Sequence, residues 1–500
     1  MGSLIKNERT KLYKRKSTLV ILLIVLGLYL MQFVFTAVLP MIIDVGYGNM
    51  SWEDAYRNQI GDYENWAAES DNSKMDIAGY EPELSWLKWL LEHEVPPTDW
   101  RADAALAMFE EAYVPPQGDE SSINTARVTA LQGFLEGNDW KGYVQYRIQE
   151  EWFDSNAQTD AERAVEHEIL ALYLDLNISP TSTRTMERLY YIGITALEAD
   201  TNSWRADQLD ILRGNKIALL RGEKEDMFGN TTILTKSQRQ QFELENKVVL
   251  QRLKTNTTPM VADSFWGWVD STVVSSNYVL IALLVLAGVI VAGEFSGGTI
   301  KLLLITPHKR QKIFWAKAYA LLEAMLLLAG AILVAGLAVA ALATMMEGVG
   351  DWQVTVFFGN VVRMPMAVYV LLKYLLGLLP VIAMSAMGLM FSTVLRRNGL
   401  AIALPLVVYF IGQMATVLIT TLLVELTGNA PPIMGYIVFS HLTVQEHMPG
   451  AMSALAGGGM NGMLTGGTGT SLLFAVSVLV AYTALFLWIA RDSFVRKDVK

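Results

Sequence analysis

The chain alternates between long apolar runs and polar segments, and the apolar runs set its architecture. Several runs reach the ~20 residues that an α-helix needs to cross about 30 Å of hydrocarbon. They predict six membrane-spanning helices, at about 18–39, 274–293, 318–345, 367–394, 399–424 and 470–490. We therefore expect an all-α polytopic membrane protein with a large, mostly helical insert after the first span.

In the insert, residues 41–270, apolar and polar residues alternate over short distances instead of forming long apolar runs. Its apolar residues recur about every 3.6 positions between Pro- and Gly-rich breaks, which predicts amphipathic helices, one of them at 186–197. Three helical stretches begin with a tryptophan behind a residue that favours helix N-caps, at Asp99-Trp100, Asp139-Trp140 and Ser203-Trp204. This recurrence indicates either a repeated helical hairpin or chance.

Charge divides the chain at the same boundaries. Residues 41–270 contain 40 acidic and 20 basic residues, a net charge of −20, whereas the rest contains 9 acidic and 19 basic residues, a net charge of +10. We assign 1–40 to an interfacial segment and the first span, 41–270 to an acidic extracellular domain, and 271–500 to a membrane domain with five spans. The absence of cysteine excludes disulfides and thiolate metal sites.

The basic residues predict the orientation in the membrane. Residues 1–17 contain six Lys and Arg against one acid, Glu8, whereas loop 425–469 contains no Lys or Arg. Because cytoplasmic loops carry the excess of Lys and Arg, we expect both termini in the bacterial cytoplasm and residues 41–270 outside the cell.

Three segments near the membrane surface carry further expectations. Leu4, Ile5 and Leu12 share one helical face, which predicts either a helix along the interface or a basic segment with no defined helix. Trp352–Val362 is compatible with a short interfacial helix. Lys373, early in the fourth span, is expected to snorkel outward.

The polar segment between the second and third spans has the strongest functional pattern. Its defining residues are Glu294, Gly297, Gly298, Thr299, Pro307, Arg310 and Lys317. A charge in hydrocarbon is costly, so Glu294 is expected either to gate or anchor this turn or only to mark the end of a span. The glycines permit a sharp turn, Thr299 can cap a following helix, and Pro307 ends that helix. Arg310 either pairs with an acidic partner or is a simple cytoplasmic charge.

Other polar residues give weaker signals. Glu323 lies within the third span, where it is expected either to pair with another helix or to reach water. His441, Glu446 and His447 form a His/Glu cluster after the fifth span, and their spacing favours a polar outer-loop site over a metal site. The chain has no phosphate-binding loop and no His-Glu-x-x-His motif, so we assign it no catalytic residue, no metal and no nucleic-acid partner.

The pattern Glu294-x-x-x-Gly298-Thr299 closely resembles the loop after the second span in ABC type-2 permeases, and Leu303, Pro307, Arg310 and Lys317 extend the resemblance. The basic N-terminal segment and the six-span plan agree with that family over about residues 1–40 and 272–500. The insert resembles that of a subgroup with a helical extracellular domain after the first span.

The resemblance implies a permease subunit of an ATP-driven exporter that is not itself an enzyme. A separate ABC ATP-binding subunit would hold ATP and Mg and dock on the cytoplasmic coupling loop 294–317. The permease would lie in the lipid bilayer as a homodimer, or as a heterodimer with a related permease. The acidic insert would either attract a cationic peptide or drug or serve only solubility.

Two other classes of protein compete with this interpretation. One is an ABC-type mechanotransmission or sensing protein, whose extracellular domain binds an envelope partner and transports nothing. The other is a membrane-anchored enzyme, which the missing nucleophile and metal constellations disfavour.

Overall fold

The protein divides into two compact units, Met41–Arg221 (the insert unit) and Met1–Pro40 with Gly222–Lys500 (the membrane unit). Residues 222–270, which we expected in the insert, therefore belong to the membrane unit. The computed structural model describes residues 2–14, 16–33, 51–69, 81–113, 124–152, 159–182, 204–225, 231–234, 236–261, 264–274, 276–300, 309–346, 348–357, 359–395, 397–427, 432–448 and 471–496.

The named elements of the insert unit are all helices. Its helices are α4 (Trp52–Glu69), α6 (Glu81–Glu92), α7 (Trp100–Ala112), α8 (Thr125–Gly137), α9 (Trp140–Gln149), α10 (Asp160–Asp175) and α12 (Trp204–Arg221). Two expected N-caps are confirmed, because the Asp99 carboxylate accepts a hydrogen bond from the amide of Arg101 at the start of α7, and Asp139 does so from Gly142 at the start of α9. Ser203 and the helix expected at 186–197 lie outside the described residues.

The insert unit has its own core. Trp86 of α6 is buried, and its indole Nε1 donates a hydrogen bond to the carbonyl of Ala102 in α7 at 2.9 Å. Leu87 and Leu90 of the same helix are also fully buried. This burial gives the insert unit stability that does not depend on disulfides.

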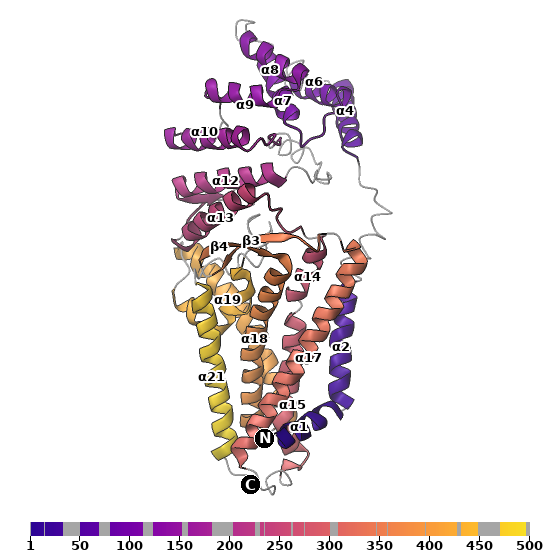
Figure 1. The fold of residues 1–500 in the computed structure, drawn as a ribbon, viewed down its shortest axis with the longest axis vertical. Coiled ribbons are helices and arrows are strands. Elements are labelled where there is room, and N and C mark those ends of the chain that lie inside the picture. Colours follow the sequence, from indigo (N-terminus) through magenta and orange to yellow (C-terminus); the bar gives the residue numbers. More distant parts are fainter. Residues whose placement is uncertain are drawn as a thin grey trace. The chain divides into compact units, whose positions relative to one another are not determined.

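The membrane unit is a bundle of long apolar helices (Figure 1). Its helices are α1 (Gly2–Lys14), α2 (Lys16–Phe33), α13 (Lys236–Thr255), α14 (Phe265–Val274), α15 (Ser276–Ser296), α17 (Arg310–Thr344), α18 (Met366–Leu395), α19 (Asn398–Thr427) and α21 (Leu472–Arg496). Among the described residues, five helices are long and apolar enough to cross a membrane, namely α15, α17, α18, α19 and α21. The first expected span falls on α2, whose apolar stretch Leu23–Gln32 is shorter. An all-α polytopic membrane protein is thus confirmed, with five of the six expected spans meeting this criterion.

The centre of the bundle is formed by α15 and α18, which pack closely together, and α18 also packs along α21. Glycines permit two of the close approaches. A Cβ atom on Gly388 of α18 would lie 3.0 Å from the Cβ of Ala287, and one on Gly288 of α15 would lie 2.5 Å from the carbonyl oxygen of Ala401. Figure 1 shows α1 at the same end of the bundle as the last turns of α21.

The prediction of an interfacial helix at Trp352–Val362 is wrong. This segment is instead an antiparallel hairpin of β3 (Trp352–Phe357) and β4 (Asn360–Pro365). Its β-branched residues favour strands, and Gly359 takes a positive φ of 79° in the turn. A second, short hairpin pairs β1 (Glu223–Glu225) with β2 (Thr231–Ile233). Three 3-10 turns follow α19, at Pro432–Tyr436, Val438–His441 and Val444–His447.

Candidate functional site

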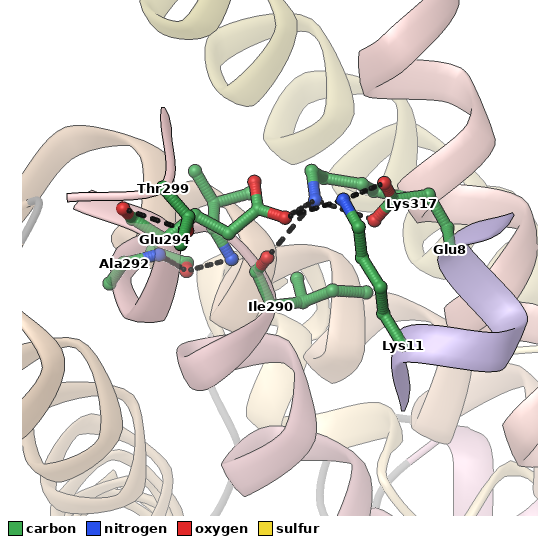
Figure 2. A network of polar contacts seen from close by, with 9 residues as sticks. Glu8, Lys11, Ile290, Ala292, Glu294, Thr299 and Lys317 are labelled. Carbon is green, nitrogen blue, oxygen red and sulfur yellow. Dashed lines mark hydrogen bonds and ion pairs between the residues drawn. The ribbon is translucent and has the colours of Figure 1, made fainter. Parts of the chain in front are cut away.

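Charged side chains from α1, α15 and α17 meet inside the membrane unit (Figure 2). Glu294 lies in the last turn of α15, and its Oε1 is 2.8 Å from Nζ of Lys317 in α17. The same ammonium is 2.7 Å from Oε2 of Glu8 in α1. The side chain of Lys317 has no exposed surface, and that of Glu294 is 3% exposed. One buried ammonium therefore joins three helices through two carboxylates.

Lys11 of α1 completes this group. Its Nζ lies 2.9 Å from Oε1 of Glu8 and 3.3 Å from Oε1 of Glu294, and 38% of its side chain is exposed. Two acids and two bases balance, which offsets part of the cost of removing each charge from water. We call Glu8, Lys11, Glu294 and Lys317 the inner ion cluster.

The two members on α1 have shifted pKa values. Burial by itself would raise the pKa of Glu8, but the ammonium groups of Lys317 and Lys11 outweigh it, and the pKa lies below its ordinary value of 4.5. Burial would lower the pKa of Lys11, but its hydrogen bond to Glu8 and the charge of Glu294 raise it above 10.5. Both groups are therefore charged throughout the physiological pH range.

The spacing of residues in α1 explains how it reaches this site. Leu4, Glu8 and Leu12 are four positions apart, so they share one face of the helix. All three are buried, and Ile5 beside them is half-buried. The amphipathic face expected from the sequence is present on a defined helix, but it contains a carboxylate and packs against α17.

The sharp turn that was expected at the glycines after α15 is present. Gly298 has a positive φ of 68°, the conformation that commonly ends helices at glycine. The amide of Gly297 donates to the carbonyl of Gly293 at 3.0 Å, which closes the last turn. The hydroxyl of Thr299 donates back to the carbonyl of Glu294 at 3.4 Å. Leu303 and Pro307 lie outside the described residues.

Arg310, at the start of α17, connects this region to the C-terminal helix. Its Nη1 donates a hydrogen bond to the backbone carbonyl of Val495, near the end of α21, at 3.3 Å. Nearby, the rings of Phe314 and Phe494 lie 6.1 Å apart. The sequence did not indicate this link between α17 and α21, and pairing of Arg310 with another protein stays a prediction.

Glu323 and Lys373 lie outside the inner ion cluster. Glu323 pairs with Arg9 of α1 at 3.2 Å, and 32% and 49% of the two side chains are exposed, so this is an interhelical pair that water still reaches. Lys373 does not snorkel outward as expected. Its Nζ is 2.7 Å from Oδ2 of Asp270, and only 7% of its side chain is exposed, because α14 supplies a counter-charge beside α18.

His441 and His447 both bond to the backbone. His441 is buried, and its Nε2 donates to the carbonyl of Gly435 at 2.7 Å. Burial, and then the proximity of His447, lower the pKa of His441 below 6.5, although the bond to Gly435 opposes them. Nδ1 of His447 lies 3.1 Å from the carbonyl of Val444. The side chain of Glu446 is not described, and the described residues contain no group of three or more His, Cys, Asp or Glu that could hold a metal ion.

Sequence reasoning identified Glu294 and Lys317 but missed their partners. Glu8 and Lys11 were counted only as charges of a basic N-terminal segment. The available signal was the position of Glu8 midway between Leu4 and Leu12, since a lone acid on an apolar helical face needs a counter-charge from another element.

Comparisons with known proteins find similarity to two proteins of Bacillus subtilis. The uncharacterized protein YhcI of Bacillus subtilis (strain 168) is 23% identical over 256 residues, which cover 50% of this chain and 73% of that protein. The uncharacterized membrane protein YdbK of the same organism is 26% identical over 242 residues, 48% of this chain and 85% of that protein. No solved structure matches the chain.

The apolar helices and the similarity to a membrane protein identify the chain as a multi-pass membrane protein. The family model described as "Protein of unknown function (DUF2705)" matches residues 249–500, which span α14 to α21 together with two members of the inner ion cluster. Since this match covers half of the chain, the protein belongs to the DUF2705 family.

Proposed function

We propose that this protein is the membrane-spanning permease subunit of an ATP-driven ABC exporter. A separate ATP-binding subunit, which carries ATP and Mg, would press on the segment 294–317 from the cytoplasm. Both termini would then be cytoplasmic and residues 41–270 extracellular, and two permeases would pair in the membrane.

The observation that carries the proposal is that both ends of this segment enter the inner ion cluster. Glu294 lies at its start and Lys317 at its end, and the two are 2.8 Å apart. A force on the segment therefore acts on α15 and α17 together, and through Glu8 it also acts on α1. The arrangement is suited to convert a push at one surface into a coordinated movement of three helices.

Burial makes the ion pairs between Lys317 and the two carboxylates strong enough to transmit a force between helices. An exposed ion pair contributes only about 0–1 kcal/mol, whereas removing one partner of a buried pair costs about 3–5 kcal/mol. Lys317 is fully buried, so the cluster belongs to the second class. By contrast, the exposed pair of Arg9 and Glu323 belongs to the first.

The resemblance to ABC type-2 permeases supports the same conclusion from the sequence. Glu294, Gly298, Thr299 and Lys317 stand at the positions that define the resemblance. In the structure, Gly298 ends α15 with a positive φ, while Thr299 bonds to the carbonyl of Glu294. These residues thus form one unit with the carboxylate that enters the cluster.

The first test is purification of the tagged full chain from its native host, where an ATP-binding-cassette subunit should co-purify. Because the chain has no cysteine, the variants Lys14→Cys and Lys312→Cys, both at exposed positions, give a specific pair of spin labels. We expect ATP with vanadate to change the distance between these labels in the complex. Recovery of the chain with no such ATPase would overturn the proposal.

The second test is the variant Glu294→Ala in the same labelled complex. We expect the ATPase to stay bound and to hydrolyse ATP while the nucleotide-dependent distance change is lost. Asp492→Asn is the matched control, because in the described part of the chain this acid forms an ion pair with Arg496 of its own helix, and its loss should leave the change intact. Uptake of a fluorescent cationic peptide into inverted vesicles then separates an exporter from an ABC-type mechanotransmitter, in which nucleotide would drive the movement without transport.

A further inference from the structure

Ser392, in the last turn of α18, binds the backbone of α15 directly. Its side chain is completely buried, and its Oγ donates a hydrogen bond to the carbonyl of Gly288 at 2.7 Å. The same oxygen accepts bonds from the amides of Ala292 at 2.9 Å and Val291 at 3.2 Å. One hydroxyl therefore makes three bonds to a single turn of the neighbouring helix.

This turn is the one in which a regular α-helix would join Gly288 and Ala292 to each other. The carbonyl of residue i and the amide of residue i+4 form the helical hydrogen bond. The Ser392 hydroxyl serves both groups at once, and a side chain that enters this ladder is a recognised cause of helix bending. Just before Glu294, a side chain of α18 thus contacts both partners of one helical hydrogen bond of α15.

Two other helices hold the same stretch. The backbone of Ala401 in α19 lies so close to Gly288 that a Cβ there would meet its carbonyl oxygen at 2.5 Å. Two residues further on, Nζ of Lys317 reaches the carbonyl of Ile290 at 3.4 Å, in addition to the carboxylate of Glu294 (Figure 2). Residues 288–294 are therefore held by α17, α18 and α19, each through backbone atoms of α15.

We propose that Ser392 is a positioning residue that sets the last turn of α15 so that Glu294 meets Lys317. In this role the hydroxyl is the fixed point about which the end of α15 moves when the segment 294–317 is pushed, a statement that rests on the proposed function. The positioning itself does not depend on an ATPase. It predicts that α15 changes shape when the hydroxyl is removed, even in the isolated chain.

The variant Ser392→Ala should change this shape without preventing folding. After the hydroxyl is lost, the carbonyl of Gly288 and the amide of Ala292 can bond to each other, so these two buried groups keep a partner. Ser392→Thr keeps the hydroxyl and is the conservative rescue variant. Any effect of alanine that threonine reverses is due to the hydroxyl and not to altered packing.

The test uses spin labels at two exposed positions, Ser296→Cys at the end of α15 and Arg397→Cys between α18 and α19. In the purified full chain, Ser392→Ala should shift or broaden the distance distribution, and Ser392→Thr should restore it. An alanine variant with the same distribution as the parent chain would overturn the inference. So would a threonine variant that behaves like alanine.

The same variants in the complex with its ATPase connect positioning to coupling. The movement per ATP hydrolysed, measured with the Lys14→Cys and Lys312→Cys labels, should fall roughly two- to tenfold in Ser392→Ala, the factor expected for hydrogen bonds of this kind. If distances at α15 shift but coupling does not, the hydroxyl positions α15 without acting in coupling, and that part of the inference fails. If no ATPase is found, the proposed function fails while the distance test still decides the positioning.

Discussion

Replacing Lys317 by methionine removes the ammonium that both carboxylates of the inner ion cluster share. Methionine fills a similar volume, so the main change is electrostatic. Lys11 remains near both acids, but 38% of its side chain is exposed. At a separation of about 5 Å and an effective dielectric constant of about 20, the repulsion between the two acids is roughly 3 kcal/mol. This agrees with the lower end of the ~3–5 kcal/mol cost of breaking a buried ion pair.

The free energy of unfolding can be measured in mixed micelles by titration with sodium dodecyl sulfate, followed by tryptophan fluorescence. We expect Lys317→Met to lose about 3 kcal/mol. The matched control is Lys312→Met, on an exposed position of the same helix, which should change stability by less than about 0.5 kcal/mol. Adding Glu294→Gln to Lys317→Met removes one of the two repelling charges, so the double variant should regain about 1 kcal/mol or more.

Two results would refute this reasoning. The first is an unfolding midpoint for Lys317→Met that equals that of Lys312→Met, which would mean that water reaches the cluster. The second is a double variant whose loss equals the sum of the two single losses, because independent sites add and coupled sites do not.

Two further predictions concern the same end of the bundle. The stability that Glu8 contributes should be present above pH 4.5 and lost as pH falls through its lowered pKa, whereas that of Lys11 should be present below pH 10.5 and lost as pH rises through its raised pKa. The rate of proteolysis of α1, measured as a function of pH, checks both limits. Constant protection of α1 across both limits would contradict the ion cluster. Gly288→Ala should cost about 1–3 kcal/mol, because its Cβ would meet the backbone of Ala401 at 2.5 Å, while Gly330→Ala, with no atom within 4 Å, should be neutral or slightly stabilising in the same unfolding titration.

The sequence identified the chemically important end of the second span but not its partners. Glu294 and Lys317 stood out because a charge at the edge of an apolar run is unusual. Glu8 did not, since one acid among six bases is read as part of a basic segment. Glu8 and Lys317 are 309 positions apart, and their contact depends on how α1 crosses α17. The hydroxyl of Ser392 gave no signal, because a serine within an apolar helix is common and its partners are backbone groups.

The β3–β4 hairpin and the pair of Lys373 with Asp270 also depended on tertiary structure. The hairpin of β3 and β4 was missed because its segment is short and apolar, and periodicity cannot separate a strand from a helix turn at that length. Lys373 was expected to reach water because it lies early in the fourth span. Once α14 packs against α18, the two charges meet at 2.7 Å.

Sequence alone determined the number and place of the apolar runs, the division into an acidic insert and a basic membrane portion, and the polar turn that begins at Glu294. These properties follow from local composition, because the cost of placing a residue in hydrocarbon or water depends mainly on that residue and its near neighbours. Only the tertiary structure decided that α1 supplies Glu8 and Lys11 to the cluster, that Ser392 holds the end of α15, and that Arg310 bonds to α21. Those contacts depend on the register of helices that are distant in sequence, and a buried charge or hydroxyl takes whichever partner that packing brings within hydrogen-bond distance.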